Sequence, residues 1–222
     1  MKKYYKYELN MLIANILSIV MFIVPIIILA ILKFDFYSSN SGLFLLELIL
    51  YFIIHELLHG LGFLIFAKNK KNIKFGITLE KGVLFAACQE KINKKAVLIS
   101  IALPLVVLTF ITFPIGILFK LPNLVSLSIL NFGGAIGDIL MFILISRAPS
   151  DVLYIDYNTD IGCYLISENN LENYTSFGFK LTEYGNESDK RIDESIKRLY
   201  VSKTSAIILG VLIIISILGL II

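Results

Sequence analysis

The chain has 222 residues, of which 57% are hydrophobic and only 17% are charged. Soluble domains are nearer half apolar and a quarter charged, so this composition favours an integral membrane protein. The net charge of +3 is too small to suggest a nucleic-acid partner. Two widely spaced cysteines exclude both a disulfide framework and a CxxC metal pair.

Long apolar runs predict the membrane helices. A lysine-rich prefix, MKKYYK, precedes the first run, which is too long for a signal peptide and is therefore expected to remain as a helix. Pro104 and Pro114 predict kinks within the third run. Each of the first four runs has the length that a transmembrane helix needs, and the fifth is short but uncharged. The five predicted spans are residues 11–32, 43–67, 96–119, 124–146 and 205–222.

Polar segments separate these spans. Residues 73–88 contain two short β-type runs around Glu80-Lys81-Gly82, which predicts a hairpin. Residues 147–204 are polar, with two short predicted strands and the end of an amphipathic helix. The expected fold is an all-α polytopic membrane protein with about five transmembrane helices, a small β-hairpin after the second, and a small cytoplasmic α+β tail segment. Residues 1–146 would form the membrane core, 147–204 a cytoplasmic polar segment, and 205–222 the C-terminal span.

The basic residues predict the orientation in the membrane, because lysine and arginine stay on the cytoplasmic side. Five spans place the N-terminus, the loop at 68–95 and the segment at 147–204 on one side. These segments hold three, eight and seven of the 20 basic residues, and the other side holds only Lys33 and Lys120. A multi-pass protein of the cell membrane with a cytoplasmic N-terminus and an external C-terminus is therefore expected.

The segment HELLH, within the second predicted span, contains the candidate zinc ligands and the candidate catalytic residue. His55 and His59 are four residues apart, so both lie on one face of a helix and can share one Zn²⁺ ion. Glu56 would then take the proton of the zinc-activated water and return it to the leaving amine. Ionisable groups inside a span are costly and are functional by default.

A third zinc ligand must come from elsewhere in the chain. Glu80 has a suitable separation but falls in the lysine-rich hairpin turn. Asp138 is the better candidate, because it is the only acid inside the fourth predicted span. His59 and Asp138 each lie about eight residues, or roughly 12 Å, from the same end of their helices. This matched depth permits one shared metal, although both carboxylates remain open.

Polar and small residues near Asp138 suggest a substrate site. Asn131 is two turns before Asp138 and would either orient the substrate backbone or hydrogen-bond a neighbouring helix. Gly133 and Gly134 would let another backbone or a substrate come close.

HELLHG in a membrane helix, the following hairpin and NFGGAIGD in a later span resemble the bacterial domain family described as putative zincin peptidases. The broader similarity is to intramembrane metalloproteases of the site-2-protease type. It implies that His55, His59 and Asp138 are ligands and that Glu56 is the catalytic acid and base. Gly134 stands where those proteases usually have a proline, and Gly137-Asp138-Ile139 replaces their Leu-Asp-Gly.

The sequence therefore predicts a zinc-dependent, membrane-embedded endopeptidase that hydrolyses peptide bonds in or near the membrane at the cytoplasmic side. Its partners would be the lipid bilayer and a membrane protein or peptide substrate, with no nucleic acid. The alternative is a non-catalytic polytopic protein with a structural zinc site, such as an accessory or immunity-type factor. The complete HExxH pattern favours the enzyme, because a structural site has no need of Glu56.

Overall fold

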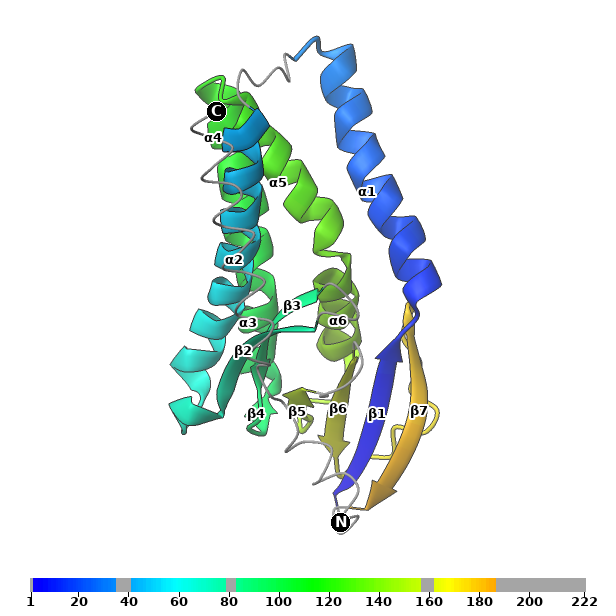
Figure 1. Ribbon diagram of the computed structural model, residues 1–222. Helices are drawn as coiled ribbons and strands as arrows, with labels where there is room; N and C mark the ends of the chain where they lie inside the picture. Colours follow the sequence, from blue (N-terminus) through cyan, green and yellow to red (C-terminus); the bar gives the residue numbers. More distant parts are fainter. Residues whose placement is uncertain (1, 35–40, 79–82, 157–161, 187–222) are drawn as a thin grey trace.

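The computed structural model describes residues 2–34, 41–78, 83–156 and 162–186. Figure 1 shows a bundle of long helices standing on a layer of strands. The helices are α1 (Met11–Ile31), α2 (Ser41–Phe66), α3 (Lys94–Leu105), α4 (Thr112–Leu118), α5 (Pro122–Gly134) and α6 (Ile136–Arg147), with a π-helical segment, η2 (Val106–Ile111), between α3 and α4.

Three of these helical stretches are long and apolar enough to cross a membrane. They are Met11–Ile31, Gly42–Phe66 and Lys94–Leu118, and the last runs through α3, η2 and α4 without a sharp bend. Helices α5 and α6 together pass the same test but are bent by 49° at Ala135, as in a broken span or a re-entrant loop. The predicted span at 205–222 lies outside the described residues.

The expectation of an all-α fold is wrong, because a five-stranded antiparallel sheet underlies the helices. Its strand order is β4-β5-β6-β1-β7, and a separate two-stranded sheet pairs β2 with β3. The strands are β1 (Lys3–Leu9), β2 (Ile73–Thr78), β3 (Val83–Cys88), β4 (Ile92–Asn93), β5 (Leu153–Asp156), β6 (Gly162–Ser167) and β7 (Phe179–Asn186).

Strand β1 is the element that the sequence interpretation missed. Its lysines were interpreted only as basic residues that precede the first helix. Its tyrosines, however, are completely buried in the sheet. Tyr5 and Tyr7 belong to the main hydrophobic core, whereas Tyr4 belongs to a second cluster that includes Tyr164 of β6. Because neighbouring side chains of a strand point to opposite faces, β1 is covered on both faces.

The sheet joins segments from both ends of the helical region. Strand β1 precedes α1, and strands β5 to β7 follow α6, yet β1 pairs with both β6 and β7. Residues before α1 and after α6 therefore lie at the same end of the bundle (Figure 1).

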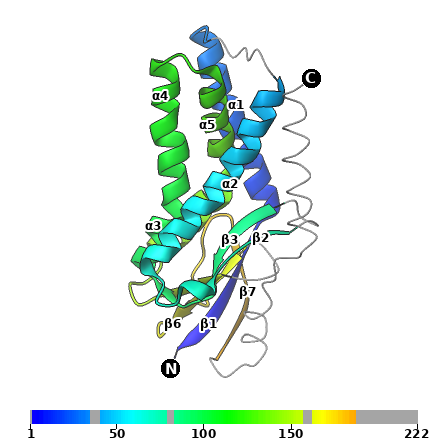
Figure 2. The ribbon, with the colours of Figure 1, turned by 60° about the vertical axis from the view of Figure 1, so that its left-hand side comes forward.

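The hairpin predicted at residues 73–88 is present, with Ile73 opposite Cys88 and Phe75 opposite Ala86. It lies along the second half of α2, as Figure 2 shows from a second direction. Gly60 permits this packing, because a Cβ atom there would meet the ring of Phe75 at 2.1 Å. The hairpin thus covers the part of α2 that carries the two histidines.

Candidate metal centre

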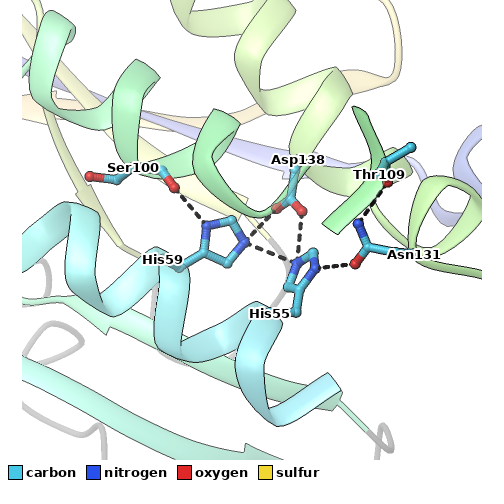
Figure 3. Close-up of polar contacts among 6 residues, drawn as sticks. All are labelled: His55, His59, Ser100, Thr109, Asn131 and Asp138. Atoms are coloured by element: carbon cyan, nitrogen blue, oxygen red, sulfur yellow. Dashed lines mark hydrogen bonds and ion pairs between the residues drawn. The ribbon is translucent and has the colours of Figure 1, made fainter. Parts of the chain in front are cut away.

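Three side chains from two separate helices converge on one point. His55 and His59 come from successive turns of α2, and Asp138 comes from the first turn of α6. Their ligand atoms all lie within 4.8 Å of one another, an arrangement that could hold a metal ion (Figure 3). His59 and Asp138, which the sequence placed at the same depth, are thus in contact in the structure. Glu80, the alternative carboxylate, lies outside the described residues.

The separations within this cluster fit a tetrahedral zinc ion. Nε2 of His55 lies 3.2 Å from Nε2 of His59 and 3.1 Å from Oδ2 of Asp138. Nε2 of His59 lies 3.3 Å from Oδ1 of Asp138. Ligands about 2.0–2.1 Å from a tetrahedral ion are about 3.3 Å apart, so each of these spacings is one that a pair of zinc ligands has.

A backbone carbonyl determines which ring nitrogen of His59 carries the proton. Nδ1 of His59 lies 2.9 Å from the carbonyl oxygen of Ser100 in α3. A carbonyl can only accept, so Nδ1 carries the proton and donates it to Ser100. In the neutral ring Nε2 then keeps its lone pair and faces the cluster, which is the state that a metal ligand needs.

A chain of hydrogen bonds orients His55 in the same way. Nδ1 of His55 lies 2.7 Å from Oδ1 of Asn131. The amide of Asn131 donates to Oγ1 of Thr109 at 2.9 Å, and Thr109 donates in turn to the carbonyl of Ser128 at 3.4 Å. The terminal carbonyl fixes the direction of every bond, so Nδ1 of His55 is the donor, and in the neutral ring Nε2 keeps its lone pair.

The break between α5 and α6 makes this double contact possible. Asn131 is in the last turn of α5 and Asp138 in the first turn of α6, and both touch the imidazole of His55. In a straight helix residues seven apart are about 10.5 Å apart along the axis. The bend brings the two side chains to opposite nitrogens of one ring.

Glu56 lies on the hairpin side of α2, outside the group of three ligand atoms. Its carboxylate accepts a hydrogen bond from the backbone N–H of Ala86 in β3. This contact joins Glu56, which directly follows His55 in α2, to strand β3.

The predicted substrate residues have different surroundings. Asn131 is 2% exposed, and its amide is engaged by His55 and Thr109. Gly133 is buried against α1, where Ser18 donates to its carbonyl at 2.8 Å and Phe22 lies over its Cα. Gly134 is exposed, and among the described residues no atom would come within 4 Å of a Cβ added to it. A role in substrate binding stays a prediction for all three.

Three contributors escaped the sequence interpretation: Ser100, Thr109 and Ser128. Ser100 and Ser128 act here through backbone carbonyls, which carry no residue signature. The one signal in the sequence was Pro104, four residues after Ser100, since a proline in a helix leaves the carbonyl four residues earlier without its usual partner.

Two histidine nitrogens and a carboxylate oxygen define a candidate zinc centre of the kind found in metallohydrolases. Residues 48–153 match the profile of a protein family described as "Putative zincin peptidase", and this segment contains the whole centre. The family suggests a zinc-dependent peptidase. No curated protein and no solved structure matched the chain.

Proposed function

We propose that this protein is a zinc-dependent, membrane-embedded endopeptidase of the HExxH type. The observation that carries the proposal is the convergence of His55, His59 and Asp138, with both imidazoles turned so that Nε2 faces the cluster. A site with three protein ligands leaves one position for water or substrate, as catalytic zinc sites do.

In this proposal each side chain has a distinct task. Zinc held by the three ligands would polarise the scissile carbonyl and make water a stronger acid. Glu56 accepts the proton of the attacking water and delivers it to the leaving amine. Ser100 and Asn131 keep the two imidazoles in place, so the ligands need no rearrangement when substrate arrives.

The substrate would be an extended peptide segment of a membrane protein or a membrane-bound peptide. Strand β3 supports this idea, because the hydrogen bond from Ala86 to Glu56 sets its edge beside the metal position. A substrate that adds as a strand along the hairpin would have its backbone fixed near Glu56. Gly134, which no described residue covers, leaves room for a chain on the other side.

We further propose that cleavage takes place near the cytoplasmic face of the cell membrane, with the N-terminus inside and the C-terminus outside. The concentration of lysine and arginine at 2–6, 68–95 and 147–204 supports this orientation. Reporter fusions after Lys95 and after Arg147 should both report cytoplasm. An external signal from either fusion would overturn the orientation.

The decisive experiment compares two substitutions in one helix. Glu56→Gln is nearly isosteric but cannot accept the proton, so it should keep zinc and fold and lose roughly 10²–10⁴-fold of the hydrolysis rate. Glu47→Gln is the matched control, because Glu47 lies in the same helix and its described partner is Asn123, at 2.7 Å. Purified variants would be incubated with a library of transmembrane peptides, and the products read by mass spectrometry.

The outcomes separate the enzyme from the non-catalytic alternative. An enzyme loses cleavage with Glu56→Gln and keeps it with Glu47→Gln. If wild type binds zinc and cleaves nothing, or if Glu56→Gln cleaves as fast as wild type, the proposed mechanism is wrong and a structural zinc site remains.

A further inference from the structure

The carbonyl that holds His59 has lost its ordinary helical partner. In an α-helix the carbonyl of residue 100 accepts the N–H of residue 104. Residue 104 is proline, which has no N–H and lies inside α3. The oxygen of Ser100 is therefore open to a group outside its own helix.

His59 uses that oxygen. Its Nδ1–H donates to the Ser100 carbonyl at 2.9 Å, and Ser100 and Pro104 are both fully buried. The close approach of α2 and α3 depends on Gly62, since a Cβ there would lie 2.5 Å from Cα of Ser100. The hydroxyl of Ser100 bonds back to the carbonyl of Ala96, so the backbone oxygen alone makes the contact with His59.

We propose that Pro104 is a positioning residue for the metal centre: its missing N–H leaves the Ser100 carbonyl free to orient His59 and present Nε2 to zinc. This inference rests on the proposed zinc site. Restoring an N–H at position 104 gives the Ser100 carbonyl a competing donor within its own helix. The carbonyl then turns back toward the direction of the helix axis. The bond to His59 weakens, and with it the affinity for zinc.

The experiment measures zinc affinity by competition with a chelator of known affinity, in purified full-length protein. Pro104→Ala should bind zinc about tenfold more weakly, as expected for the loss of a partner that orients a metal-bound histidine. Pro25→Ala is the matched control, because Pro25 also lies inside an apolar helix, α1, and should leave the affinity within about twofold of wild type. Circular dichroism reports whether each variant keeps its helices.

A second readout separates positioning from a general effect on folding. Replacing zinc with Co²⁺ gives an absorption spectrum that reports the ligand geometry, and Pro104→Ala should change it while Pro25→Ala does not. If Pro104→Ala fails to fold, Pro104→Gly restores the same N–H on a more pliable backbone and carries the test instead.

A third measurement needs no variant. The chain has only two histidines, so ¹⁵N-histidine spectra of the zinc-loaded protein are simple to assign. His59 should have a protonated Nδ1 and a metal-bound Nε2; zinc on Nδ1 would overturn the proposal. Equal zinc affinity and an equal cobalt spectrum in folded Pro104→Ala or Pro104→Gly would also overturn it. A wild type that binds no zinc would instead refute the proposed function.

Discussion

The Nε2 atoms of His55 and His59 face each other at 3.2 Å, and each ring already donates its Nδ1 proton elsewhere. In the neutral rings the two Nε2 lone pairs repel one another at this distance, unless a metal ion or a proton shared with Asp138 lies between them. A bound metal ion would turn this repulsion into two coordinate bonds, so the metal should contribute directly to the stability of the folded protein.

Removal of the metal is therefore expected to lower stability. A ligand at 100 to 1,000 times its dissociation constant stabilises the folded state by about 3–4 kcal/mol. A strong chelator should lower the thermal midpoint of the wild-type protein, and added zinc should restore it. His59→Ala should show no response to either treatment. Equal chelator responses in wild type and His59→Ala would place the zinc elsewhere.

Thr109 is expected to matter for zinc although it lies two hydrogen bonds from the metal position. Thr109→Val removes the hydroxyl that receives the amide of Asn131, so Asn131 can rotate away from His55. We expect roughly tenfold weaker zinc binding with the helices intact. Thr109→Ser keeps the hydroxyl and should bind zinc nearly as wild type does. Both would be measured by chelator competition, and equal affinities in the two variants would contradict this role.

Gly62 should not tolerate a methyl group. In Gly62→Ala the new Cβ would lie 2.5 Å from Cα of Ser100, and backbone cannot swing aside as a flexible side chain can. Helices α2 and α3 would have to separate, at a cost of about 1–3 kcal/mol. Gly134→Ala is the control for stability, because no atom of the described segments lies within 4 Å of its Cβ position. Thermal midpoints of the two variants should differ clearly, and equal midpoints would mean that the helices do not pack as described.

The sequence could predict the three side chains of the candidate metal centre because side-chain type and helical spacing both point to them. Two histidines one turn apart and one acid at the same depth are readable features, and the structure brings all three together. The orientation of Asn131 was not predicted, because Gly133 and Gly134, which directly precede the break at Ala135, were interpreted as room for a neighbouring backbone and not as the site of a bend.

The sequence did not predict the five-stranded sheet for a different reason. In β1, lysines alternate irregularly with tyrosines, and before an apolar helix such a segment has the composition of a topological signal. Its burial depends on β6 and β7, which lie more than 150 residues later in the chain. Local composition holds no information about a partner at that distance, so only the folded chain reveals this strand.

Asp156 in β5 should make the stability of the sheet depend on pH. Its carboxylate accepts the backbone N–H of Cys88 at 2.5 Å and also the hydroxyl of Tyr154. Burial nevertheless raises the pKa of Asp156 from 3.8 to about 6. The folded protein therefore holds this proton more tightly than the unfolded chain does. The resulting stability is complete below pH 4 and is lost as the pH rises through about 6.

Comparison of two aspartates isolates this effect from other titrations. Asp156→Asn cannot ionise, so the thermal midpoint of wild type relative to this variant should fall between pH 4.5 and about 6.5.

Asp151→Asn is the matched control, since hydrogen bonds from Ser167, Glu168 and Asn169 lower the pKa of Asp151 below its ordinary 3.8. Asp151 is thus ionised in both the folded and the unfolded chain throughout that window, and its comparison should be flat. Titrations of groups that do not interact with either aspartate cancel in the difference. A wild-type advantage over Asp156→Asn that is constant with pH, or that grows as the pH rises, would show that burial does not govern this carboxyl group.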